Sequence, residues 1–319
     1  MEILKLAPAC KDYLWGGTRL KTEFGKDFAG EKLAETWELS THEAGASIIA
    51  EGADSGMSLP SYIEKYGKEI LGTRCQNFET LPILIKLIDA RDNLSIQVHP
   101  DNEYAKKHEK DYGKTELWYV VDCEEGAFLY YGFSKTVSKE ELKDRIENQT
   151  LLEVLNKVRV KKGDTFFIEA GTIHAIGAGI LIAEIQQSSN VTYRVYDYGR
   201  VGADGRQREL HIDKALDVLY TAPIGKEYDF GEHLGVSDYF IVDKLDLDGI
   251  YSDCVSEESF LSLLVLDGSL TVKTKDDMKT VAKGDSLMIL ANSGEYSMEG
   301  KAEVIMTVVG KDTTMEEDD

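Results

Sequence analysis

Cysteine, long apolar runs and positive charge are all scarce in this chain of 319 residues. The four cysteines, Cys10, Cys75, Cys123 and Cys254, are widely separated and include no Cys-x-x-Cys pair. Sparse, unpatterned cysteine is typical of a reducing compartment, so we expect a cytoplasmic location. No run of eighteen apolar residues occurs, which excludes a transmembrane helix, and the first residues lack the features of a signal peptide.

The deficit of positive charge limits the partners that the chain can bind. The 36 Lys and Arg residues are outnumbered by 58 Asp and Glu, which gives a formal net charge of −22. Nucleic acid requires a basic face, so neither nucleic acid nor a membrane is expected as a partner. Anionic ligands are repelled at long range, so a phosphorylated substrate would require a metal and clustered Lys or Arg in its pocket.

A short alternating segment, residues 94–99 (LSIQVH), carries the first candidate site. In a strand of period two, Ser95, Gln97 and His99 share one face and the three aliphatic residues share the other. Pro100 ends this strand because it has no N–H for the ladder. The segment therefore predicts a polar strand face that points into a pocket or toward water.

Two later residues can complete a metal site with His99. Glu116 opens an expected strand that can pair with the strand ending at His99. Residues 163–174 (GDTFFIEAGTIH) form a Gly-Asp turn, an apolar strand, a Gly turn and His174, which resembles the second metal motif of cupin barrels. Histidine and carboxylate ligands suit a borderline divalent ion such as zinc, and the Gln97 amide is an additional candidate ligand.

The apolar run 81–88 (LPILIKLI) predicts a buried strand in which Lys86 is out of place. A lysine among aliphatic residues commonly extends to water at an edge. The alternative is that Lys86 points into the same cavity as Ser95. The residues alone leave both interpretations open.

An internal repeat defines the architecture that we expect. Residues 283–291 (KGDSLMILA) match residues 162–170 (KGDTFFIEA) almost position for position. The position equivalent to His174 is Glu295, and no histidine follows His233. The second copy is therefore expected to lack a metal site and to have a structural role.

We expect a mainly β protein with two cupin-type β-barrels (jelly rolls), of which the first binds metal. The first, catalytic domain spans residues 1–225, and the second, structural barrel spans 226–319. Helical inserts in the first domain are expected at about 59–71, 101–111 and 138–157.

Four motifs follow one another along the chain: QVHPD (97–101), GKTE (113–116), GTIH (171–174) and SSNVTYR (188–194). In these motifs and their order the chain resembles type I mannose-6-phosphate isomerases, and most of all the short bacterial branch of that family. The similarity runs from about residue 11 to residue 210 and is looser through the second barrel. The chain departs from the longer members at Thr115, where they have proline, and in lacking their large helical domain.

The resemblance implies a zinc-dependent aldose–ketose isomerase that interconverts mannose 6-phosphate and fructose 6-phosphate through a cis-enediolate. The residues that it implies are a one-zinc site of His99, Glu116 and His174 with Gln97 as an additional ligand, a catalytic Arg194, Lys114 and Glu184 as alternative proton carriers, and Lys86, Ser95 and Arg200 near the substrate and its phosphate. The expected partner is a phosphosugar, and the expected state is a monomer or weak homodimer.

Two other functions fit the same residues. An Fe(II) dioxygenase of the cupin type would also use histidine and carboxylate ligands. A non-catalytic sugar-phosphate sensor would need no catalytic base, but no helix-turn-helix or other output module is visible in the sequence. Lys86, Lys114, Arg194 and Arg200 favour a phosphorylated substrate.

Overall fold

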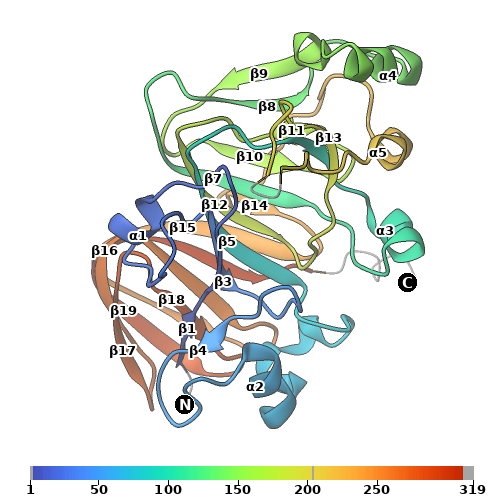
Figure 1. Ribbon diagram of the computed structural model, residues 1–319. Helices are drawn as coiled ribbons and strands as arrows, with labels where there is room; N and C mark the ends of the chain where they lie inside the picture. The colour runs from blue at the N-terminus through green and yellow to red at the C-terminus, as the bar shows by residue number, and fades with distance from the viewer. Residues whose placement is uncertain (1–2, 203–204, 312–319) are drawn as a thin grey trace.

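The computed structural model describes residues 3–202 and 205–311, which form a mainly β structure with three antiparallel sheets (Figure 1). The sheet that we call the large sheet consists of β1 (Ile3–Ala7), β4 (Ile48–Ile49), β14 (Gly235–Val236), β15 (Phe240–Val255), β16 (Leu261–Lys273), β17 (Met278–Ala282), β18 (Ser286–Ile289) and β19 (Gly294–Val309). Its strands are ordered β14-β15-β19-β16-β18-β1-β4, with β17 paired to β16. The first strand of the chain, β1, thus lies in the sheet formed mainly by the last strands.

The other two sheets contain the segments that carry the expected site residues. The middle sheet consists of β2 (Ala9–Lys11), β3 (Glu35–Leu39), β5 (Ile83–Ala90), β7 (Glu116–Cys123), β10 (Thr165–Ile168) and β12 (Ile180–Gln187). The outer sheet consists of β6 (Ile96–Val98), β8 (Phe128–Phe133), β9 (Leu155–Arg159), β11 (His174–Ala175) and β13 (Tyr193–Tyr196). The order is β10-β7-β12-β5-β3-β2 in the middle sheet and β13-β6-β11-β8-β9 in the outer sheet.

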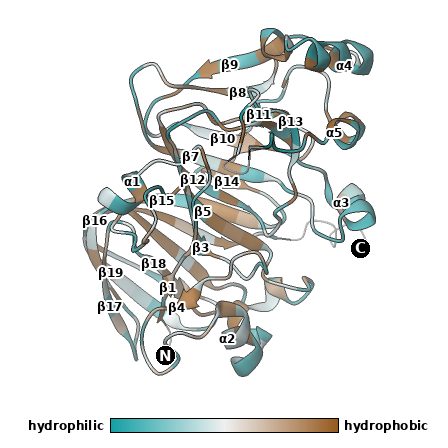
Figure 2. Cartoon of the chain, viewed as in Figure 1, coloured by the Kyte–Doolittle hydropathy of each residue, from teal (hydrophilic) through white to brown (hydrophobic). Residues whose placement is uncertain are grey.

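The middle sheet packs on both of its faces because its central strands carry apolar residues on both. Along β7, Leu117 and Tyr119 belong to the core shared with the large sheet, whereas Trp118 and Val120 belong to the core shared with the outer sheet. Figure 2 shows the hydrophobic colour concentrated on the strands of this sheet. The two closed barrels expected from the sequence are therefore not seen among the described residues: three open sheets lie in layers, and the middle one serves two cores.

The helices lie at the periphery and are short. They are α1 (Arg19–Thr22), α2 (Leu59–Tyr66), α3 (Asn102–His108), α4 (Lys139–Glu147) and α5 (Ile212–Val218), with 3-10 turns at Lys68–Leu71, Thr73–Cys75 and Leu151–Val154. Within the described residues, none of these helices is long and apolar enough to cross a bilayer.

The helix expected over 138–157 is only half as long in the structure. Ser138 caps its start, accepting a hydrogen bond from the Glu141 N–H at 3.1 Å, as its sequence position indicated. The helix ends before Gln149, which adopts a positive φ of 58° that a right-handed helix does not allow. The end of the expected segment instead forms the start of β9.

The internal repeat seen in the sequence has a structural counterpart. Gly163 and Gly284 both have positive φ, 89° and 92°. Each donates its N–H to a valine carbonyl of the neighbouring strand, Val120 at 2.9 Å and Val265 at 2.8 Å. The same valines donate to the aspartate that follows each glycine. The two copies therefore form the same type of turn. In the second copy, the residue that corresponds to His174 is Glu295, which lies exposed on β19.

A buried ion pair connects the N-terminal segment to β3 of the middle sheet. The Lys26 Nζ lies 2.6 Å from the Glu38 Oε1, and both side chains are almost fully buried. Lys26 also donates to the carbonyl oxygen of Gly284 in the repeated turn. Removing one member of a buried ion pair leaves the other charge uncompensated in a medium of low polarity.

We therefore expect Lys26→Met to lower the free energy of unfolding by about 3–5 kcal/mol, because Glu38 is left unpaired. Urea denaturation followed by circular dichroism measures this change. The control is Lys135→Met, which removes an exposed pair with Glu141 at 2.8 Å and is expected to cost less than about 1 kcal/mol. Equal losses in the two variants would contradict a structural role for the buried pair.

Candidate metal centre

Strand register brings polar residues of the middle sheet into one row. Glu184 of β12 lies opposite Lys86 of β5 on one side and opposite Trp118 of β7 on the other. Next along the same strand face, Gln186 lies opposite Glu116. Since side chains alternate along a strand, this row faces the outer sheet while the intervening aliphatic residues face the large sheet.

The outer sheet supplies the facing residues. Gln97 of β6 lies opposite His174 of β11 and opposite Arg194 of β13. Ser95 and His99 flank the short strand β6. The expected alternation of Ser95, Gln97 and His99 thus places their side chains on the face of the outer sheet that meets the polar row of the middle sheet.

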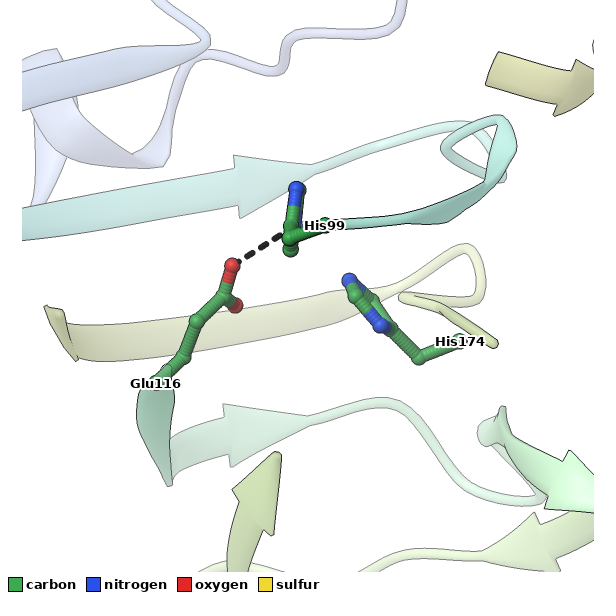
Figure 3. Close-up of side chains that lie close together, drawn as sticks. All are labelled: His99, Glu116 and His174. Carbon is green, nitrogen blue, oxygen red and sulfur yellow. Dashed lines mark ion pairs between the residues drawn. The ribbon is translucent and has the colours of Figure 1, made fainter. Parts of the chain in front are cut away.

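His99, Glu116 and His174 come together between the two sheets, and each offers one ligand atom within 4.8 Å of the others. Figure 3 shows both imidazole rings turned toward the carboxylate of Glu116. All three residues are fully buried. The two halves of the site, 75 residues apart at His99 and His174, are thus joined by sheet packing.

The outer nitrogens of both rings are fixed by backbone carbonyls. The His99 Nδ1 lies 2.8 Å from the Val191 carbonyl oxygen, and the His174 Nδ1 lies 2.8 Å from that of Thr172. A carbonyl oxygen only accepts hydrogen bonds, so each Nδ1 carries the proton and each Nε2 presents a lone pair. Burial, and then the Lys114 charge, lowers the pKa of His99 to about 3; burial likewise lowers the pKa of His174, so both rings are neutral near pH 7.

Glu116 supplies a buried negative charge beside these lone pairs. Burial alone would raise its pKa, but neighbouring charge, that of Lys114 above all, outweighs burial and holds the pKa well below its ordinary value. The Glu116 Oε1 lies 2.8 Å from the His99 Nε2 and 2.8 Å from the Lys114 Nζ, yet it has no hydrogen bond of acceptable geometry. Two acceptor atoms thus face each other, which is favourable when a cation lies between them. The donor set fits a borderline divalent ion.

The Gln97 amide lies at the edge of this cluster. Its Nε2 is 3.4 Å from the His174 Nε2, and its Oε1 is 3.5 Å from the Ser95 hydroxyl. In this orientation the amide nitrogen, rather than the oxygen that a metal requires, is closer to the histidine.

The role of Trp118 was not anticipated from the sequence. Its indole N–H donates to the Glu116 Oε2 at 2.7 Å and to the Glu184 Oε2 at 2.8 Å. One buried N–H therefore fixes the positions of two carboxylates, and one of them, Glu116, is a candidate metal ligand. The only indication of this role in the sequence was that Trp118 follows Glu116 by two residues on a strand. This spacing places both side chains on one face of the sheet.

A cavity of about 330 Å³ adjoins the cluster. It is lined by Tyr13, Trp15, Glu35, Lys86, Ile88, Leu94, Ser95, Gln97, Lys114, Ile176, Glu184, Asn190, Thr192, Arg194 and Arg208. Four of these residues are cationic and two are anionic. The cavity wall is therefore positive although the chain as a whole is strongly acidic.

Lys86 points into this cavity, which decides between the two interpretations of its position. It is 4% exposed, and its Nζ lies 3.0 Å from the Glu184 Oε1 and 4.0 Å from the Glu35 Oε2. Burial alone would lower its pKa, but Glu184 and Glu35 outweigh burial and raise it. The lysine is therefore a charged member of the site and not an edge residue.

Glu184 is the second buried carboxylate of the site. Burial, followed by repulsion from Glu116, raises the pKa of Glu184. Its Oε1 lies 4.0 Å from the Lys114 Nζ. Lys114 thus touches both the metal cluster and the cavity.

Three of the arginines in residues 194–208 are placed differently. Arg194 lines the cavity and donates from Nη1 to the Glu209 carbonyl at 2.8 Å, and its buried Nε has no partner among the described residues. Arg200, which the sequence placed near the substrate, is not among the lining residues and pairs with Asp197. Arg208, which the sequence analysis missed, lines the cavity instead. It follows a turn in an irregular segment, where no periodicity indicates the direction of a side chain.

Comparisons with known proteins place the chain in a family. Residues 3–127 match the model of the phosphomannose isomerase type I catalytic domain, and residues 231–309 match that of the mannose-6-phosphate isomerase cupin domain. The mannose-6-phosphate isomerase ManA of Bacillus subtilis is 36% identical over 317 residues, covering 96% of this chain and 98% of its own. The chain belongs to the type I mannose-6-phosphate isomerase family.

Further members of the family support this assignment. A mannose-6-phosphate isomerase of Streptococcus mutans is 38% identical over 304 residues, which cover 92% of this chain and 93% of that protein. The crystal structure of the B. subtilis isomerase superposes with a TM-score of 0.90 at 33% identity, covering 96% of this chain and 99% of that one. A structure described as zinc-bound mannose 6-phosphate isomerase, 17% identical, shares the fold with a TM-score of 0.77 and covers 97% of this chain. The mainly β architecture is thus the cupin-like fold of this family.

The contacts of Trp118 generate a prediction about metal affinity. Trp118→Phe removes the donor to Glu116 while keeping an aromatic ring, so we expect metal affinity to fall by about 10- to 100-fold. Competition with a chromogenic chelator measures this change. The control is Tyr119→Phe, the neighbouring residue on the opposite face of β7, which loses a hydrogen bond to Glu303 at 2.6 Å and is expected to keep its affinity. Equal affinity in both variants would contradict the role of the indole.

Proposed function

We propose that this chain is a zinc-dependent isomerase that interconverts mannose 6-phosphate and fructose 6-phosphate. The observation that carries the proposal is the buried pair of acceptors, the His99 Nε2 and the Glu116 Oε1, at 2.8 Å beside a cation-rich cavity. Zinc is the metal named in the zinc-bound family structure of the same fold. His99, Glu116 and His174 would hold one ion, with the Gln97 amide as an additional ligand.

The reaction moves a proton between the C2 and C1 carbons of the sugar through a cis-enediolate. The difficult step develops negative charge on the O1 and O2 oxygens. The bound ion would supply Lewis-acid stabilisation of that charge. Arg194 would add a fixed positive charge at the same oxygens, because it lines the cavity opposite Gln97 on the neighbouring strand.

Lys114 and Glu184 are the proposed proton carriers. Both line the cavity, and the Lys114 Nζ and the Glu184 Oε1 are 4.0 Å apart, so one substrate carbon can lie within reach of either group. The raised pKa of Glu184 supports a role in proton transfer near neutral pH, since a carboxyl of ordinary pKa is a weak base there. Lys114 is supported by its contact with the cluster at the Glu116 Oε1.

The remaining assignments concern the substrate and the rest of the chain. Lys86 and Ser95 line the cavity and are proposed to contact the substrate, as is Arg200, which lies outside the lining. We propose that residues 1–225 form the catalytic domain and 226–319 a structural unit, although β1 pairs with β18 across that division. The proposed location is the cytoplasm, which agrees with four cysteines that are free in the structure, and the proposed state is a monomer or weak homodimer.

An iron dioxygenase would use the same ligands, and a sugar-phosphate sensor the same cavity. Neither alternative needs two ionisable groups, Lys114 and Glu184, beside the metal cluster and the cavity. Oxygen uptake without isomerisation would favour the first alternative. Binding of mannose 6-phosphate without turnover would favour the second.

Metal removal tests the proposal directly. We expect a chelator to abolish formation of fructose 6-phosphate from mannose 6-phosphate and zinc to restore it. We also expect His99→Ala to lose metal and activity together, because the Nε2 lone pair is removed. The measurements are metal content by mass spectrometry and product formation on the same samples. His108→Ala, at an exposed histidine of α3, is the matched control and should keep both. Full activity of the metal-free protein would exclude the mechanism.

Arg194 gives a second prediction, which separates binding from catalysis. If its charge stabilises the enediolate, Arg194→Ala lowers kcat by about 100- to 1,000-fold while zinc content is unchanged. Steady-state kinetics with metal analysis measures both effects. An unchanged kcat with a raised KM would make Arg194 a substrate-binding residue.

A further inference from the structure

The cations of the cavity fall into two groups with different partners. The Lys86 Nζ is 3.0 Å from the Glu184 Oε1, and the Lys114 Nζ is 2.8 Å from the Glu116 Oε1. Both ammonium groups are thus balanced by buried carboxylates of the protein itself. Each of these two pairs is close to neutral, whereas Asp197 is shared by Arg200 and Arg208, so that group keeps a net positive charge.

The second group consists of two guanidinium side chains, Arg194 and Arg208. Burial, followed by the nearby charge of Arg208, lowers the pKa of Arg194. In the described part of the chain, Arg194 has no carboxylate within ion-pair distance, and the partner of Arg208 is the buried Asp197, outside the cavity lining. Two like charges on one half-buried wall repel each other, and an anion bound between them relieves this repulsion.

Arg208 is held in a fixed orientation. Its Nε donates to the Asp197 Oδ2 at 2.8 Å and its Nη2 donates to the Asp197 Oδ1 at 2.6 Å. These parallel bonds fix the planar guanidinium in the way that Arg–carboxylate pairs do. The Nη1 has no hydrogen-bond partner among the residues that the structure describes. A donor that is already oriented loses little conformational entropy when it binds an anion.

Arg200 is bound to the same carboxylate, but its guanidinium group is oriented differently from that of Arg208. Its Nε donates to the Asp197 Oδ1 at 3.1 Å, and its Nη1 donates to the Asn93 carbonyl at 2.6 Å. Its guanidinium also lies 5.3 Å from the Tyr198 ring centroid. The hydrogen-bond donors of Arg200 are therefore engaged by other residues of the protein, and Arg200 does not line the cavity.

A tight backbone turn after Asp197 allows two arginines, Arg200 and Arg208, to reach this one aspartate. Tyr198 and Gly199 have consecutive positive φ values of 58° and 68°. A bulky residue at positive φ is strained, and such strain is found where a local geometry has a function. The turn reverses the chain after Asp197, and the returning segment carries Arg208 back to the carboxylate.

We propose that Arg208, oriented by Asp197, binds the phosphate of the substrate and sets the preference for a phosphorylated over an unphosphorylated sugar. This assignment rests on the proposed function for the identity of the sugar. It differs from the family resemblance, which places Arg200 at that position. Asp197 is in this view a positioning residue, because it acts through Arg208.

The test compares Arg208→Gln with Arg200→Gln, since both variants remove one arginine from the same aspartate. The full-length, zinc-loaded proteins are titrated with mannose 6-phosphate, inorganic phosphate and mannose. In Arg208→Gln we expect the dissociation constants of the two phosphates to rise by about 10- to 100-fold, because a charge-assisted hydrogen bond is lost. The constant for mannose should change by less than about twofold. Arg145→Gln, on the distant helix α4, is the control and should match the wild type.

Three results would overturn the proposal: wild-type phosphate affinity in Arg208→Gln, equal losses for mannose and mannose 6-phosphate, or a greater loss in Arg200→Gln. If Arg208→Gln does not fold, Arg208→Lys takes its place. It keeps the charge but cannot bond to Asp197 with a planar fork, so a selective loss of about tenfold is expected for both phosphates. Binding is read at equilibrium, where an active protein holds the two phosphosugars at a constant ratio and the dissociation constant is an apparent one. A wild type that binds mannose 6-phosphate but does not isomerise it would therefore refute the proposed function and still test Arg208.

Discussion

The alternation of side chains in the middle sheet is the constraint on which the site depends. Its central strands present aliphatic residues to the large sheet at every second position, and Lys86, Glu116 and Glu184 occupy positions between them. A slip of one residue in any of these strands would move a charge into the apolar core. Burying an unpaired charge costs several kcal/mol, so the apolar packing on one face secures the register of the polar row on the other.

Within that row, no charge is buried alone. Glu116 is balanced by Lys114, Glu184 by Lys86, and Trp118 donates to both carboxylates. The exception is the contact between the Glu116 Oε1 and the His99 Nε2, where two acceptors meet. Among the described residues, a network that pairs each charge of the row while the His99 Nε2 and the Glu116 Oε1 face each other beside the Lys114 ammonium is consistent with a site shaped for a cation.

The sequence predicted the parts of the structure that local pattern controls. The strand around Gln97, the turn before His174 and the cap at Ser138 all follow from period, glycine and capping rules, and the structure has each of them. Convergence of His99 and His174 followed only from the family motifs, because no local rule sets the distance between residues 75 apart.

The features that the sequence did not predict depend on tertiary packing. Closed barrels were expected because the repeat indicated two similar units, but the middle sheet is shared between two cores and the sheets stay open. The pairing of β1 with β18 joins residues nearly 300 positions apart, which no pattern in either strand specifies. Arg208 was missed for the same reason: its direction is set by Asp197 and the intervening turn, not by a periodicity.

The acidity of the chain and the positive cavity are compatible because they act over different distances. At physiological ionic strength the field of surface charges decays over about 8 Å, so the net charge of −22 weakens outside the molecule within that distance. Inside the cavity, screening is weaker and the nearest groups dominate, namely four cationic side chains against two anionic ones. A phosphosugar would therefore meet moderate repulsion on approach and net attraction on entry. Selection between anionic and neutral sugars is then a property of the cavity wall, and overall charge contributes mainly to the rate of encounter.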